Sequence, residues 1–119
     1  MENNREFAKD RIARDLQGDL MEDNHGTRRF FRCWLDGSYL GEDHYRANVA
    51  FLRANSHKPA SLRSFVISEF VHYMAHDADC SPRHAQNAIT QIIPRQQLER
   101  LNNALIGDAL DLIAEYEDA

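Results

Sequence analysis

The chain lacks any hydrophobic run approaching the roughly 20 residues that a membrane-spanning helix needs. Its longest apolar stretches, such as 65–67 and 104–106, are interrupted by charged or polar neighbours. Residues that favour strands are also few, with three valines and two threonines against 14 alanines and 11 leucines. These shortages exclude a membrane protein and a sheet-rich fold, and they favour helices.

Cysteine is scarce as well. The two thiols, Cys33 and Cys80, lie 47 positions apart, and the polar start of the chain lacks the apolar core of a secretory signal. We therefore expect a cytoplasmic protein with two reduced thiols rather than a disulfide. The 119 residues contain no repeat and no linker, which predicts a single domain over 1–119 that can hold a core without metals or disulfides.

Apolar residues recur at helical spacing along most of the chain, which predicts an all-α bundle of about six helices. The expected N-caps are Asn3 or Asn4, Thr27, Ser61, and Ser81 followed by Pro82. Pro94 should end or kink the fifth helix. The expected helices occupy 4–19, 28–35, 42–54, 62–76, 82–93, and a long final stretch after Pro94 that reaches Tyr116.

The fourth of these helices should be central, because its apolar residues spread over well more than half of its circumference. A remaining strip of small residues, Ser64, Ser68 and Ala75, should let another helix approach closely. Arg63 fits neither the apolar surface nor this strip.

Charge is divided unevenly along this acidic chain. The net charge of −5 is the sum of −3 in residues 1–27, +3 in 28–100 and −5 in 101–119. This division is either self-complementary within the fold or presents one sign to a partner, and the sequence leaves both open. The candidate partner-binding residues lie on the second and last helices: Arg28, Arg29, Arg32, Asp108, Asp111 and Glu115.

The best chemical candidate is a regularly spaced set of histidines and a cysteine: His72, His76, Cys80 and His84. Two histidines four residues apart lie on one helix face, and three histidines with one cysteine are an acceptable zinc set. The spacing matches no zinc-finger pattern, and the simpler interpretation is four ordinary helix and loop residues. A nucleophilic Cys80 assisted by His84 or His76 lacks an orienting third residue.

Paired carboxylates, a Ser–His–Asp context and a glycine-rich phosphate loop are all missing from the sequence. The leading hypothesis is therefore a non-enzymatic protein-binding module without a cofactor, an inhibitor or adaptor of the kind that a phage or mobile element encodes. Its long last helix also suits a homodimer.

Two alternatives stay open: a metal-binding helical protein that uses the histidine–cysteine set, with zinc as a candidate metal, and a nucleic-acid-binding regulator. The regulator would use the second-helix arginines, or a helix-turn-helix that presents Arg83, His84, Gln86 and Asn87. An isoelectric point near 5.6 counts against nucleic acid, because binding to phosphates draws on cations.

Overall fold

A computed structural model of the chain describes residues 2–16 and 26–118. In these two stretches the structure has six α-helices and no strand, which confirms the all-α prediction. The helices are α1 (Glu2–Asp15), α2 (Gly26–Leu35), α3 (Glu42–Asn55), α4 (Pro59–Ala78), α5 (Pro82–Ile92) and α6 (Arg95–Asp118). No helix in the described residues is both long and apolar enough to cross a bilayer.

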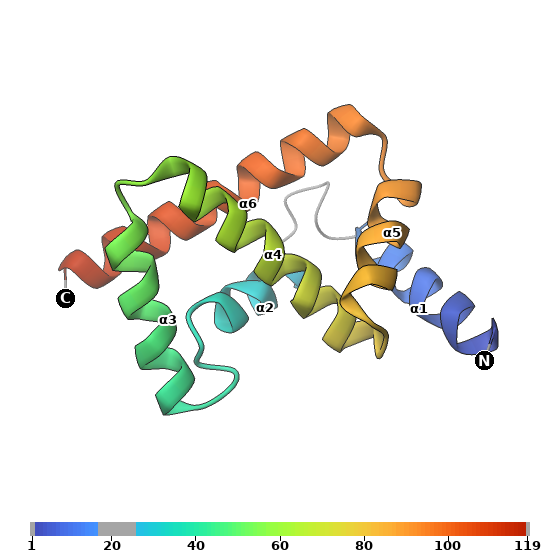
Figure 1. Cartoon of the computed structure of the whole chain (residues 1–119), viewed down its shortest axis with the longest axis horizontal. Coiled ribbons are helices and arrows are strands. Elements are labelled where there is room, and N and C mark those ends of the chain that lie inside the picture. The colour runs from blue at the N-terminus through green and yellow to red at the C-terminus, as the bar shows by residue number, and fades with distance from the viewer. Residues whose placement is uncertain (1, 17–25, 119) are drawn as a thin grey trace.

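Helix α4 lies at the centre of the bundle and packs against each of the other five helices (Figure 1). Its buried side chains come from several faces: Leu62, Val66, Phe70, Tyr73, Met74 and Ala75. They belong to one hydrophobic cluster that takes residues from all six helices. The predicted central position of this helix is therefore confirmed.

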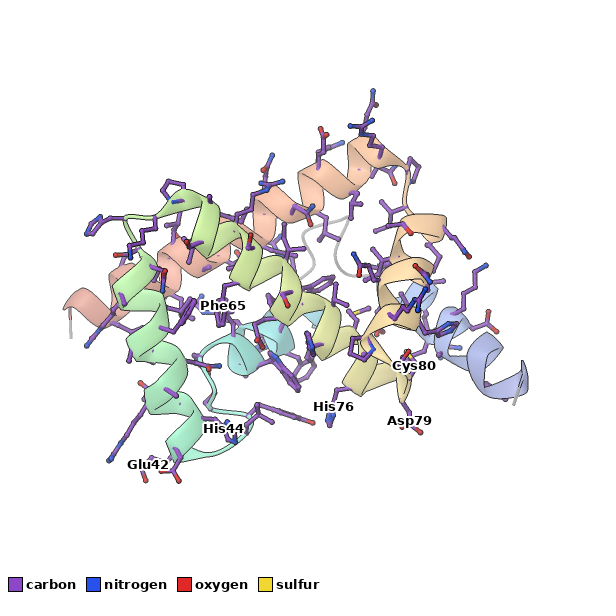
Figure 2. All side chains as sticks on the ribbon, in the orientation of Figure 1. Glu42, His44, Phe65, His76, Asp79 and Cys80 are labelled. Atoms are coloured by element: carbon purple, nitrogen blue, oxygen red, sulfur yellow. The ribbon has the colours of Figure 1, made fainter. Side chains whose placement is uncertain are left out.

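Contacts between aromatic rings help to hold α2 and α3 against α4. Phe31 of α2, which is 1% exposed, meets Phe70 edge-on with 5.1 Å between ring centroids. Phe65, which is labelled in Figure 2, contacts Phe51 of α3 with 4.3 Å between ring centroids and the rings tilted by 32°. Such ring pairs stabilise packing beyond the area that they bury.

The start and end of α5 follow the predicted signals. The Ser81 hydroxyl accepts a hydrogen bond from the backbone N–H of His84 at 3.1 Å, and Pro82 occupies the first helical position. Ile93 has an extended backbone, the conformation that a following proline imposes. Pro94 thus separates α5 from α6.

The predicted N-caps of α1, α2 and α4 are wrong. Helix α1 begins at Glu2, so Asn3 and Asn4 lie within it. Helix α4 begins at Pro59 rather than after Ser61. Proline is favoured at the first helical position, because the backbone N–H that it lacks would have no partner within the helix there.

The start of α2 and the end of α4 also differ from the prediction. Helix α2 begins at Gly26 and so includes Thr27. Helix α4 continues to Ala78, where Asp79 ends it in the left-handed conformation with φ of 56°. The predicted first helix extends to residues 17–19, which lie outside the described residues.

The connection between α2 and α3 depends on Gly37. This residue has a φ of +84°, which L side chains rarely adopt, and a Cβ there would overlap the backbone carbonyl of His44. The loop can therefore approach the first turn of α3 this closely only with glycine.

Replacing Gly37 with alanine should lower the free energy of unfolding by about 1–3 kcal/mol, because the new side chain is strained at this φ and overlaps α3. Gly107→Ala in α6 is the matched control. Its Cβ would enter open space in a helix, so it should raise stability by about 0.5–1 kcal/mol. Urea unfolding followed by circular dichroism measures both, and effects of the same sign would contradict the close approach.

Candidate binding groove

A groove of about 550 Å³ opens between α4 and the start of α5. Its α4 side consists of pairs of residues four positions apart, which share one helix face. Its α5 side is the beginning of the next helix, reached through a turn of three residues. The lining residues are Arg63, Ser64, Ile67, Ser68, Val71, His72, Pro82, Arg83 and Gln86.

The serine strip of α4 forms one side of this groove. Ser64 and Ser68 are exposed, whereas Ala75 of the same strip is buried. The predicted close approach of another helix is therefore wrong for the two serines. Arg63, which fitted neither the core nor the strip, also lines the groove, and its Nη1 donates to Oδ1 of Asn103 in α6 at 3.4 Å.

The ring of His72 lines the groove with one nitrogen already engaged. Its Nδ1 lies 2.7 Å from the backbone carbonyl oxygen of Ser68. Because a carbonyl oxygen only accepts, Nδ1 must carry the hydrogen and donate it. The other ring nitrogen, Nε2, is then the one that a ligand in the groove would contact.

His76 belongs to a different environment from His72. Its ring lies 5.4 Å from that of Trp34 and 6.0 Å from that of Tyr39, measured between centroids. Trp34 is held in turn by its Nε1, which donates to Oε2 of Glu69 at 2.9 Å. The two histidines are one turn apart on α4, yet one lines the groove and the other joins an aromatic cluster.

Cys80 lies beyond the end of α4, in the turn that leads to α5 (Figure 2). It is half-buried against the edge of the core, and burial, followed by the charge of Asp79, raises the pKa of its thiol. Cys33 and Cys80 are both free, as expected. A raised pKa leaves less thiolate, so the environment does not activate Cys80 as a nucleophile.

The structure does not bring the proposed zinc ligands together. Among the side chains that the structure describes, no three from His, Cys, Asp or Glu are close enough to share a metal ion. This finding includes the whole candidate set: His72, His76, Cys80 and His84. The physical reason is that regular spacing places residues along a helix, while neighbouring rings and hydrogen bonds decide where each side chain turns.

The candidate partner-binding residues of α2 and α6 largely pair with one another. The guanidinium of Arg28 donates from Nε and Nη2 to the two carboxylate oxygens of Asp108, each at 2.8 Å. Arg32 pairs with Glu115, and this hydrogen bond raises the pKa of Arg32. Within the described residues, then, much of the divided charge is self-complementary.

The remaining two candidates, Arg29 and Asp111, are exposed. Arg29 is next to Arg28 in the sequence, but it forms no ion pair with any residue that the structure describes. A surface with one such arginine has little charge left to offer a partner.

No protein-family model, curated protein or solved structure matches this chain. Its function is therefore inferred from the arrangement of its own residues. The groove was not among the sites expected from the sequence, although two signals pointed towards it. Arg63 interrupted the apolar pattern of α4, and the small residues of the strip left room that no neighbouring side chain fills.

The two thiols should differ in reactivity. In single-thiol variants carrying Cys33→Ser or Cys80→Ser, we expect Cys80 to react with iodoacetamide more slowly than Cys33 at pH 8, because it is half-buried and its pKa is raised. Mass spectrometry of the alkylated protein over time measures both rates. Faster alkylation of Cys80 would reinstate it as a candidate nucleophile.

The Arg28–Asp108 pair should contribute measurably to stability. Its two side chains are 14% and 27% exposed, so Arg28→Ala leaves a partly buried carboxylate without its partner and should cost about 1–3 kcal/mol. Arg46→Ala is the control, because the Arg46–Glu42 pair is 74% and 75% exposed and contributes at most about 0.5 kcal/mol. Urea unfolding compares the two, and equal losses would refute a structural role for the buried pair.

Proposed function

We propose that this chain is a non-enzymatic protein-binding module that holds a short segment of a partner protein in the groove between α4 and α5. The observation that carries this proposal is the groove itself, which combines an apolar floor with polar sides. Ligand-binding pockets in proteins commonly have this composition, with a few polar groups that fix the orientation of the ligand. The proposal keeps the leading hypothesis but moves the binding surface away from the charged faces of α2 and α6.

The chemistry of the lining suits a peptide. Ile67 and Val71 are half-buried and offer apolar contact along one face of α4. Ser64, Ser68 and Gln86 add hydroxyl and amide groups that can both donate and accept hydrogen bonds, as a peptide backbone requires.

Rigid support also favours a binding role. Helix α4 is packed against every other helix, so the groove is built on an element that has little freedom to lose. A preformed site avoids much of the ordering cost that binding otherwise incurs.

Cys80 and Tyr73, whose pKa values burial raises, lie outside the groove. Tyr73 is a buried member of the core. Neither the thiol of Cys80 nor the phenol of Tyr73 is therefore available to a ligand there.

Filling the groove tests the proposal. Ser68→Trp places an indole in the groove without removing a core residue, and Ala50→Trp puts the same side chain on an exposed position of α3. Wild-type protein and both variants are immobilised and exposed to extract of the producing cells, and the bound proteins are quantified by mass spectrometry. We expect a partner whose recovery falls about tenfold or more with Ser68→Trp and is unchanged with Ala50→Trp.

Circular dichroism first establishes that both variants are folded. Recovery of every bound protein at equal levels by wild type and Ser68→Trp would overturn the proposal, as would an extract from which wild-type protein captures nothing.

A further inference from the structure

We infer that the groove selects an acidic segment, in which aspartate or glutamate residues flank an apolar side chain. This inference rests on the proposed function and names the chemistry of its ligand. The chain as a whole has 19 acidic and 14 basic residues, yet the groove is lined by two arginines, Arg63 and Arg83. None of the described residues that line it is acidic. The groove is therefore a local concentration of positive charge on an acidic protein.

The two arginines of the groove have no carboxylate partner among the described residues, a property that they share with Arg29 of α2. Arg11, Arg28, Arg32 and Arg46 each pair with a carboxylate of the same chain. Arg63 instead donates to the neutral amide of Asn103.

Arg83 forms no ion pair with any residue that the structure describes. Its guanidinium and that of Arg63 thus retain donors in the fork geometry that matches a carboxylate.

The dipole of α5 adds to the positive potential of the groove. The first residues of this helix, Pro82 and Arg83, line the groove, so the positive end of the helix dipole lies beside it. The first turn of α5 carries no acidic side chain, although that is where an acid would be most favourable. Ser81 caps this turn with a neutral hydroxyl, so a carboxylate from a partner beside Pro82 and Arg83 would still be favoured by the helix dipole.

The apolar floor and the wider surface distinguish a peptide from a nucleic acid. Ile67 and Val71 provide contact for an aliphatic or aromatic side chain between the acids. A nucleic acid would gain two arginines in the groove and then extend over a protein of net charge −5, which repels phosphates. The observations therefore favour an acidic protein segment.

The test is selection of random phage-displayed peptides on the full-length protein, with Ser68→Trp as the counter-selection. Peptides retained by wild type and lost by the variant are synthesised with a fluorescein label, and their Kd is measured by fluorescence polarisation. We expect these peptides to be enriched in aspartate and glutamate around an apolar residue, and their affinity to fall as NaCl is raised.

Charge-reversal variants then locate the interaction. Arg63→Glu and Arg83→Glu should each weaken binding by about tenfold, because each removes a hydrogen bond to a charged group and adds repulsion. Arg29→Glu is the matched control, since it makes the same change of charge at an exposed arginine of α2 outside the groove. We expect it to leave the Kd unchanged.

Each contrary outcome has a separate meaning. Groove-dependent peptides that lack acidic residues, or that bind the arginine variants and wild type alike, would overturn the acidic ligand and leave the proposed function standing. If no selected peptide is lost with Ser68→Trp, both are wrong. Tighter binding of a fluorescein-labelled single-stranded DNA with the same dependence on Arg63 and Arg83 would replace the acidic peptide by a nucleic acid.

Discussion

The rest of the structure depends on covering the apolar surface of α4. A helix that is apolar around most of its circumference is unstable in water unless neighbours bury several of its faces at once. Five helices do so here, and the aromatic contacts of Phe31 with Phe70 and of Phe51 with Phe65 attach two of them. The part of α4 that needs no cover is the polar strip with Ser64, Ser68 and His72, and this strip becomes one side of the groove. The apolar faces of α4 thus build the core, and its polar strip builds one side of the candidate site.

Charge in this protein serves the fold and the groove in different ways. Ion pairs join elements that are distant in sequence, with Arg11 of α1 beside Asp77 of α4 and Arg28 of α2 beside Asp108 of α6. These pairs use much of the charge that looked available to a partner. The arginines that line the groove have no carboxylate beside them in its described lining, so an acidic ligand suits them. The net charge of the whole chain was therefore a poor guide to the charge of its ligand.

Local signals explain how much of the fold was predictable. Helical periodicity depends only on residues three or four positions apart, and the Ser81–Pro82 start and the Pro94 break act within a single turn. Errors occurred where two local signals competed. Pro59 started α4 ahead of Ser61, and the left-handed Asp79 rather than Asp77 ended it. Such choices shift a boundary by two or three residues without changing the number or order of helices.

The candidate site was much less predictable, because its parts meet only in the folded chain. The sequence by itself determined about six helices and a central fourth helix, since these follow from local spacing and composition. Tertiary structure alone decided which charges pair, as with Arg28 and Asp108, which are 80 positions apart. It also decided that His72 and His76 separate into different surroundings, and that Arg63 and Arg83 line one groove. The physical reason is that side-chain partners are set by distances between helices, and helix periodicity carries no information about those distances.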